Sequence, residues 1–397
     1  MDAVLDDLDS LMENYEVDGI IAIGNVYETP DIYWLTGFRS TDQITYVKNR
    51  GEEPVVATFL NTLERVLKES RIRRTHDLSE IYIGLMKEGK SARDNIGVFV
   101  KDVMKKVFTG KVVGVPDHFP AERLVIIQKM GYEVKVVPEL LKEARATKSA
   151  AEIDAIKKAG DATVGGITKL LEMVKDSDIG PNKTLMYEGE ALTVGRIKLA
   201  LEHFLLDHGA EAAMDTILAV GKKGFDWHYL GALEDEIKAE EPIILDVFPR
   251  LKQERYVADV TRTFVKGTVS KKLCDMFESV QASVGAAVDA LKDGVQIDDV
   301  NMACAESLKR SGYDSRRLNP EATEGMTHGL GHGIGLEVHE YPSLYNRQDH
   351  FKSGHVITVE PGVYFKEYGG VRIENDYLVS TDRAVLLTDG LDEILYL

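Results

Sequence analysis

Short apolar runs alternate with amphipathic segments in the first part of the chain, up to about residue 140. The runs are rich in β-branched residues and have the length of strands, whereas the segments at 103–107 and 121–130 have helical spacing. The runs cover residues 19–23, 55–59, 96–100, 112–115 and 134–137. This alternation predicts a small α/β domain with a parallel or mixed sheet.

The pattern changes near residues 140–149, where we expect a second domain to begin. Ser149 and Glu152 have the spacing of a capping box, which predicts that a new helix starts there. We therefore expect two domains, one formed by residues 1–143 and the other by residues 144–397.

The second domain combines helices with strands. Apolar positions at helical spacing predict one helix from about Lys271 and another after Asp298. Strand-like segments bounded by turn residues cover 242–247, 256–265, 356–359, 362–365, 371–373 and 377–379. Helices that cover antiparallel strands predict an α+β domain.

Four carboxylates interrupt the strand-like runs of the second domain. Asp246, Glu360 and Glu374 end three such runs, and Asp259 lies within a fourth. One acid in such a place usually faces solvent, but four in separate strands predict a shared buried site. Buried carboxylates are unfavourable unless cations meet them, and two divalent cations would neutralise four negative charges. The turns between Asp246 and Asp259, and between Glu360 and Glu374, favour hairpins that place the carboxylates side by side.

A glycine-rich segment at 327–335 contains His328 and His332, and His339 follows it. The two histidines have the spacing of a helical zinc motif, but the glycines around them disfavour a helix. We instead expect a strand or bulge whose backbone approaches a ligand closely. The chain has only 10 histidines, so three in this short stretch indicate an active site.

Composition narrows the possible partners. The formal net charge of −18 disfavours nucleic acid and anionic lipid. No apolar run approaches the ~20 residues of a membrane span. The acidic, amphipathic residues 1–19 are not typical of a secretory signal or transit peptide. Cys274 and Cys304 match no metal-binding spacing and are predicted to be buried thiols in a reducing compartment. We therefore expect a cytoplasmic protein.

Several longer motifs occur in a characteristic order. They are DIYWLTGFRS (31–40), ARATKSAAEIDAIKKAG (144–160), ADVTRTF (258–264), GHGIGLEVHE (331–340), VEPGVY (359–364) and GGVRIEN (369–375). Together they resemble the pita-bread metallopeptidases, in particular the group of Xaa-Pro dipeptidases (prolidases) and Xaa-Pro aminopeptidases. The resemblance implies an α+β pita-bread (creatinase/aminopeptidase) domain preceded by a smaller α/β creatinase-like domain.

The resemblance also implies two divalent metal ions and five ligands, Asp246, Asp259, His332, Glu360 and Glu374. Asp259 and Glu374 would bridge both ions. Asp246 would complete the shell of one ion, and His332 with Glu360 that of the other. Oxygen and imidazole ligands without thiolate suit Mn²⁺, Co²⁺, Fe²⁺ or Zn²⁺.

Further active-site residues follow from the same resemblance, namely His228, His328, His339 and Arg372. Glu360 would accept a proton from the attacking water and return it to the leaving prolyl nitrogen. His339 or His228 would stabilise the oxyanion. The expected reaction is hydrolysis of the peptide bond before proline in dipeptides or short oligopeptides. Because a partner's amino-terminal domain often closes the site in this group, we expect a homodimer.

Other functions on the same scaffold compete with this prediction. Creatinase-like enzymes lack the metal ligands, so the five intact residues argue against that branch. A different metal-dependent hydrolase or lyase, or a non-catalytic binding protein, stays open. The segment 251–255 also makes the interval from Asp246 to Asp259 longer than in many relatives, which leaves the substrate preference open.

Overall fold

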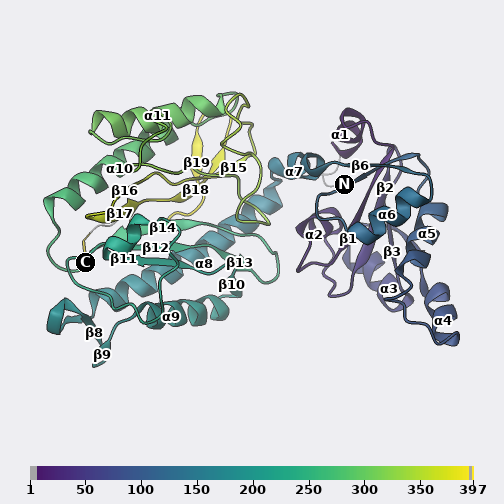
Figure 1. Cartoon of the computed structure of the whole chain (residues 1–397), viewed down its shortest axis with the longest axis horizontal. Coiled ribbons are helices and arrows are strands. Elements are labelled where there is room, and N and C mark those ends of the chain that lie inside the picture. Colours follow the sequence, from purple (N-terminus) through teal and green to yellow (C-terminus); the bar gives the residue numbers. More distant parts are fainter. Residues whose placement is uncertain (1–6, 393–395) are drawn as a thin grey trace. The chain divides into compact units, whose positions relative to one another are not determined.

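The computed structural model describes residues 7–392 and 396–397 and divides into two compact units, residues 1–145 and 146–397 (Figure 1). The first six residues of the acidic amino-terminal stretch lie outside the described residues. Among the described residues, no helix has both the length and the apolar character needed to cross a membrane.

The first unit contains a six-stranded mixed sheet. Its strands are β1 (Gly19–Gly24), β2 (Ile44–Asn49), β3 (Val55–Thr58), β4 (Arg74–Asp77), β5 (Val112–Val115) and β6 (Glu133–Val136). They lie in the order β4-β3-β2-β1-β5-β6. β2 is antiparallel to both β1 and β3, whereas the other neighbouring pairs are parallel. The predicted mixed sheet is therefore confirmed.

Seven helices accompany this part of the described chain. They are α1 (Leu8–Asn14), α2 (Pro30–Thr36), α3 (Leu60–Glu69), α4 (Ser79–Lys87), α5 (Ile96–Lys106), α6 (Ala121–Lys129) and α7 (Pro138–Ala146). The prediction of a strand at 96–100 is wrong, because helix α5 begins at Ile96. Phe99, Val100 and Val103 share one buried face at helical spacing, so the apolar run is the start of a longer helical pattern.

The second unit contains four long helices, two short 3₁₀ helices and short strands. The helices are α8 (Ala150–Lys175), α9 (Val194–Asp207), α10 (Lys271–Ala290), α11 (Ile297–Arg310), η2 (Pro181–Lys183) and η3 (Gly221–Phe225). The strands are β7 (Asp178–Ile179), β8 (Leu185–Tyr187), β9 (Glu190–Ala191), β10 (Ala210–Ala212), β11 (Ile217–Val220), β12 (Ile243–Val247), β13 (Pro249–Leu251), β14 (Val260–Phe264), β15 (Val356–Val359), β16 (Gly362–Phe365), β17 (Gly369–Arg372), β18 (Asn375–Val379) and β19 (Ala384–Leu386). Ser149 and Glu152 form the predicted capping box at the start of α8.

Two pairs of helices enclose the central strands of this unit (Figure 1). Helices α8 and α9 share one apolar core with β11, β12 and β14. Helices α10 and α11 share a second core with β15 to β18. Both cysteines are free: Cys304 is buried as predicted, whereas Cys274 on α10 is only half-buried because it lies at the edge of this core.

The strands between the helix pairs are antiparallel. β12 pairs with β14, which confirms the first predicted hairpin. β16 pairs with β17 and β15 pairs with β18, which confirms the second. The two groups of strands meet where the Glu374 N–H donates to the Thr261 carbonyl at 3.1 Å. The four predicted acids therefore belong to strands that lie next to one another.

Candidate metal centre

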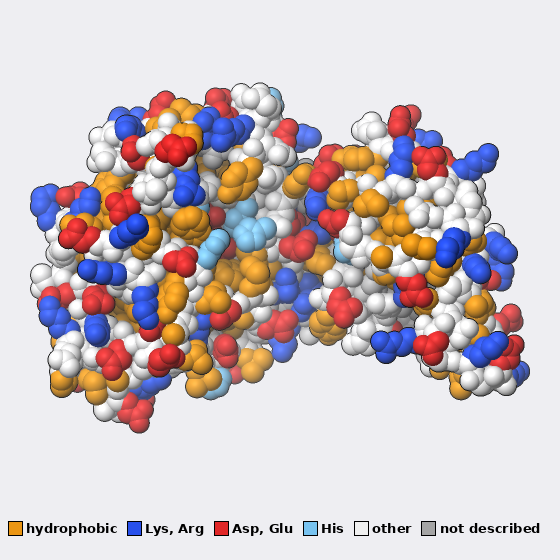
Figure 2. Space-filling view, in the orientation of Figure 1, with side chains coloured by type: hydrophobic (Ala, Val, Ile, Leu, Met, Phe, Trp, Pro, Cys, Tyr) orange, Lys and Arg blue, Asp and Glu red, His pale blue; other side chains and the backbone are white. Residues whose placement is uncertain are grey.

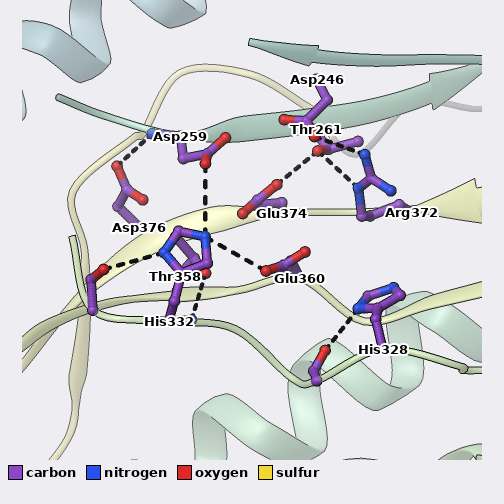
Figure 3. Close-up of polar contacts among 12 residues, drawn as sticks. Asp246, Asp259, Thr261, His328, His332, Thr358, Glu360, Arg372, Glu374 and Asp376 are labelled. Carbon is purple, nitrogen blue, oxygen red and sulfur yellow. Dashed lines mark hydrogen bonds and ion pairs between the residues drawn. The ribbon is translucent and has the colours of Figure 1, made fainter. Parts of the chain in front are cut away.

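The four predicted acids converge where the two groups of strands meet (Figure 3). Asp246 lies within β12, opposite Thr261 of β14, and Asp259 directly precedes β14. Glu360 lies between β15 and β16, and Glu374 lies between β17 and β18. The side chains of Asp246, Asp259 and Glu374 are buried, and that of Glu360 is 19% exposed. Strand pairing thus places all four carboxylates around one point.

The glycine-rich segment carries His332 toward these acids in an extended conformation. The Thr358 N–H donates to the His332 carbonyl at 2.8 Å, and the His332 N–H donates to the Thr358 hydroxyl at 3.1 Å. A Cβ atom on Gly331 would lie 2.1 Å from the Thr358 carbonyl oxygen, so only glycine fits there. The expected non-helical conformation is confirmed, and here the glycine lets the backbone approach a neighbouring strand.

The His332 ring presents an unprotonated nitrogen to the acids. Its Nδ1 lies 3.1 Å from the Gly333 carbonyl, which can only accept, so Nδ1 carries the proton. Nε2 lies 3.8 Å from Asp259 Oδ2 and 3.6 Å from Glu360 Oε1. These separations are too long for hydrogen bonds. Burial lowers the pKa of His332 to about 3, so the ring is neutral, as a metal ligand must be.

The acids repel one another in this buried setting. Burial, followed by the charges of Glu374 and Asp246, raises the pKa of Asp259 well above its usual range. Burial, followed by the charges of Glu360 and Asp246, does the same for the pKa of Glu374. Burial raises the pKa of Glu360 to about 8, although the Arg372 charge opposes it. Ionising all of these groups at neutral pH requires compensating positive charge.

The residues present fit a bound cation. One oxygen each of Asp246, Asp259 and Glu374 is buried and has no hydrogen-bond partner among the described residues. Ligand atoms of Asp259, His332 and Glu374 lie within 4.8 Å of one another. Asp246 and Glu360 flank this group on either side (Figure 3). Carboxylate oxygens that have no hydrogen-bond partner, beside a neutral imidazole nitrogen, are suitable ligands for a divalent metal ion.

Neighbouring side chains hold the second oxygens of Glu374 and Asp246 and the backbone of Asp259. The Thr261 hydroxyl donates to Glu374 Oε2 at 2.7 Å, and Arg372 Nη2 donates to Asp246 Oδ2 at 2.7 Å. The Asp259 N–H donates to Asp376 Oδ2 at 3.0 Å. These contacts fix the orientation of the carboxylates, as outer-shell partners do in metal sites.

Arg372 is the centre of a buried network. Besides Asp246, its guanidinium donates to the hydroxyls of Thr261 and Tyr364 and to the Trp227 carbonyl. The surrounding acids and Tyr364 raise its pKa despite the opposing effect of burial, so it is always charged. Arg372 therefore holds Asp246 directly and holds Glu374 through the Thr261 hydroxyl.

The three further histidines predicted for the site differ in exposure. His328 is half-buried, and its pKa is lowered to about 3 by burial and then by the Arg372 charge. His339 is exposed, and its ring centroid lies 4.2 Å from that of His332. His228 is also exposed. Its charge lowers the pKa of both His328 and His339, so His228 lies near each of these two rings. Figure 2 shows histidine side chains gathered among hydrophobic ones on one face of this unit.

Some residues of this site had no assigned role in the sequence analysis. Tyr364 links Arg372 to His328, and the Trp227 ring contacts the rings of both His328 and Tyr364. Asp376 is a fifth buried acid, and its Oδ1 has no partner among the described residues. In the sequence it directly precedes the apolar run 377–379 of β18, and this position at the edge of a strand was its only signal.

Known proteins share this architecture. A prolidase from Pyrococcus horikoshii superposes with a TM-score of 0.77 at 23% identity and covers 98% of this chain and 99% of its own. An Xaa-Pro dipeptidase from Bacillus anthracis gives a TM-score of 0.81 at 21% identity, with 99% of each chain covered. An X-Pro aminopeptidase from Thermotoga maritima gives 0.77 at 21% identity, covering 98% of this chain and all of its own (100%). The fold is thus that of the pita-bread enzymes, as predicted.

The fold and the cluster of acids define a metallopeptidase. Residues 154–381 match metallopeptidase family M24, and the chain belongs to that family. The Xaa-Pro dipeptidase of Pyrococcus furiosus is 30% identical over 269 residues, which cover 66% of this chain and 69% of that protein. The predicted resemblance is confirmed, and membership of the family implies a requirement for divalent metal.

Proposed function

We propose that this chain hydrolyses the peptide bond before proline in short peptides with the help of two divalent cations. The proposal is carried by the buried oxygens of Asp246, Asp259 and Glu374, which have no hydrogen-bond partner among the described residues. Buried carboxylate oxygens can stay ionised at neutral pH only when positive charge meets them. The names of the relatives, Xaa-Pro dipeptidase and X-Pro aminopeptidase, support peptides containing proline as substrates.

The geometry supports five ligands for the two cations. In Figure 3 Glu374 lies between Asp246 and Glu360, and Asp259 lies beside His332, so Asp259 and Glu374 would be shared by the two ions. Asp246 would complete the shell on the side of Arg372, and His332 with Glu360 would complete the other. When bound, the ions supply a nucleophilic water near neutral pH and polarise the scissile carbonyl group. Mn²⁺, Co²⁺, Fe²⁺ and Zn²⁺ all suit these ligands.

Proton transfer is assigned to Glu360. This carboxylate is the most exposed of the four, at 19% of its side chain, so it can reach both water and substrate. We propose that Glu360 accepts the proton of the attacking water and delivers it to the prolyl nitrogen as the bond breaks. His339 and His228 lie at the exposed side of the cluster, where an imidazole N–H can donate to the developing oxyanion.

A pocket beside the site supports a preference for dipeptides. It extends from His328 past Tyr345 and is lined by Arg316, Arg317 and Arg347. Arg317 is paired with Asp298, and Arg316 donates to backbone carbonyls. No side-chain partner of Arg347 is found in the described part of the chain. We propose that Arg347 holds the carboxylate of a dipeptide substrate.

The test begins with protein freed of metal by a chelator and then supplied with Mn²⁺, Co²⁺ or Zn²⁺. The dipeptide Ala-Pro and the tripeptide Ala-Pro-Ala are offered as substrates, and release of alanine is measured. We expect cleavage of Ala-Pro only after metal is added. Failure to cleave either peptide with any of the metals would refute the proposed function, whereas cleavage of the tripeptide alone would assign an aminopeptidase.

The role of Arg347 is tested separately. Arg347→Met should raise the KM for Ala-Pro about 10-fold or more, because a charge-assisted hydrogen bond to the carboxylate is lost. Arg310→Met, an exposed arginine at the end of α11, is the matched control and should change nothing. An unchanged KM in Arg347→Met would show that the carboxylate is bound elsewhere.

The homodimer and the cytoplasmic location stay predictions. Sedimentation of the metal-loaded protein at several concentrations measures the first, and fractionation of the source cells measures the second. We expect the mass of two chains in sedimentation. A monomer with full activity would exclude a site completed by a partner subunit.

A further inference from the structure

Residues 333–341 fold back on themselves directly after the predicted metal ligand His332. The Glu340 N–H donates to the Gly333 carbonyl at 2.8 Å, and the two residues pair as an antiparallel bridge. The same carbonyl accepts from His332 Nδ1 at 3.1 Å. The imidazole and the far end of the loop therefore share one acceptor. A shift of Glu340 would disturb the contact that orients His332.

The 333–341 loop also carries His339, whose ring centroid lies 4.2 Å from that of His332. The residues of the loop, all of which the structure describes, form neither a helix nor a strand. A backbone contact holds the first part of the loop, where the Ile334 N–H donates to the Val356 carbonyl at 3.1 Å. The places of both histidines therefore depend on what holds the rest of the loop closed.

The carboxylate of Glu340 turns back into the loop. Its Oε1 accepts from the Glu337 N–H at 2.9 Å, and the Glu337 carbonyl accepts from the Gly335 N–H at 3.1 Å. A Cβ atom on Gly335 would lie 2.6 Å from Glu340 Oε2, so the glycine leaves room for the carboxylate. The side chain of Glu340 is only 5% exposed. A buried carboxylate thus holds the loop closed from within.

Lys148, just before helix α8, brings a positive charge to this carboxylate. Its Nζ lies 3.4 Å from Glu340 Oε2, and its side chain is only 1% exposed. The same Nζ donates to the carbonyls of Ala146 and Tyr341, at 3.3 Å and 3.5 Å. The backbone of Lys148 is fixed as well, because its N–H donates to the Gly354 carbonyl at 2.8 Å. Lys148 therefore joins the start of α8 to the end of the loop.

We propose that Lys148 is a positioning residue, which pairs with Glu340 and thereby fixes the 333–341 loop with His332 and His339. The part that concerns His339 rests on the proposed function, whereas the part that concerns His332 is a statement about metal binding. Removal of one partner from a buried ion pair leaves a charge that has to be solvated, and the loop must open to solvate Glu340. Replacement of both partners by neutral groups leaves no such charge.

The experiment measures Mn²⁺ affinity by chelator competition and the kinetics of Ala-Pro cleavage. Lys148→Met should weaken the affinity about 10-fold and lower kcat about 10-fold to 100-fold, the range for lost outer-shell supports. KM should change little, because the displaced imidazoles act on the metal and the reacting atoms. Lys148→Arg keeps the charge and should preserve both values. Lys169→Met, which removes an exposed lysine of α8 paired with Glu172, is the matched control and should change neither.

A double variant tests whether Lys148 acts through Glu340. In Lys148→Met/Glu340→Gln the amide oxygen can still accept from the Glu337 N–H, and neither partner is charged. We expect metal affinity and kcat to return to within about 3-fold of the wild-type values. A double variant as defective as Lys148→Met would overturn the proposal, since Lys148 would then act through another group. If Lys148→Met does not fold, the double variant and Lys148→Arg decide by the same measurements.

A merely structural role gives a different result. Lys148→Met would then have a lower melting temperature but wild-type Mn²⁺ affinity and kcat well below that temperature, and this outcome would also overturn the proposal. If wild-type protein binds Mn²⁺ but cleaves neither Ala-Pro nor Ala-Pro-Ala, the proposed function fails. The loss and return of Mn²⁺ affinity across the variants then still test the positioning of His332.

Discussion

Removal of metal should make the stability of this protein fall as the pH rises from 5 to 8. In the protein without metal, burial raises the pKa of Glu360 to about 8 from an ordinary value of 4.5. The folded state then keeps a proton that the unfolded state has already lost. Stability from this group is therefore complete below pH 4.5 and is lost progressively up to about pH 8. Asp259 and Glu374, whose pKa values are also raised, act in the same direction.

The size of the effect follows from the shift. Each pH unit above 4.5 lowers the free energy of unfolding by about 1.4 kcal/mol for as long as Glu360 stays protonated in the folded state. At pH 7 the loss is therefore about 3 kcal/mol relative to low pH. Such a loss is a large fraction of the ~5–15 kcal/mol by which a domain is stable. Divalent metal at saturation should remove the dependence, because cations bind the ionised carboxylates of the folded state and stabilise it by mass action.

Urea denaturation at pH 5, 6, 7 and 8 measures this dependence with chelator or with Mn²⁺. Trp227 is the one tryptophan of the second unit, so its fluorescence in a Trp34→Phe variant reports on the unfolding of that unit. Glu360→Gln is the control for the titration. This variant lacks one titrating carboxyl group, so the slope of the unfolding free energy against pH should be smaller by up to about 1.4 kcal/mol per pH unit.

Two results would refute this reasoning. The first is a metal-free protein whose stability rises or stays constant between pH 6 and pH 8. The second is a Glu360→Gln variant with the full slope of the wild type, which would assign the titration to other groups. In the first case the acids would have to be solvated or spread apart when metal is absent.

Two further changes address the supports of the site. Thr261→Val removes the hydroxyl that donates to Glu374 and should weaken metal affinity about 10-fold in a chelator competition assay, while unchanged affinity would exclude this support. Gly331→Ala places a Cβ atom 2.1 Å from the Thr358 carbonyl oxygen and should lower the free energy of unfolding by ~2 kcal/mol or more. Gly285→Ala in α10, which meets nothing within 4 Å, is the matched control and should stabilise by about 0.5–1 kcal/mol; equal melting temperatures would contradict this expectation.

The sequence was most informative where a polar residue interrupts a buried strand. Asp246 and Glu360 are conspicuous because the strands before them are almost entirely apolar, so their positions could be predicted without tertiary contacts. The same logic failed at 96–100, because a short apolar run fits a buried strand and the start of an amphipathic helix equally well. Only its continuation through Val103 and Met104 distinguishes the two.

The supporting contacts could not be predicted in this way, because they join residues that are distant in the sequence. Arg372 reaches Asp246 across 126 positions and Trp227 across 145. No periodicity or spacing encodes such pairs, and they depend on how β12, β17 and η3 are brought together. The interval between Asp246 and Asp259 is a similar case: its residues 249–251 form β13, which pairs with β10, and no local pattern indicated this pairing.

The charge of the site explains why these supports matter. Two buried arginines border the acids: Arg372 donates to Asp246 Oδ2, and Arg262 donates to the backbone carbonyl of Glu374. Burial raises the pKa of Asp376, whose carboxylate accepts from the Asp259 N–H. The arginines lower the cost of ionising the acids that they contact, and Asp376 fixes the backbone of one of them. Loss of either kind of support should therefore change the affinity for cations even though none of these residues is a ligand.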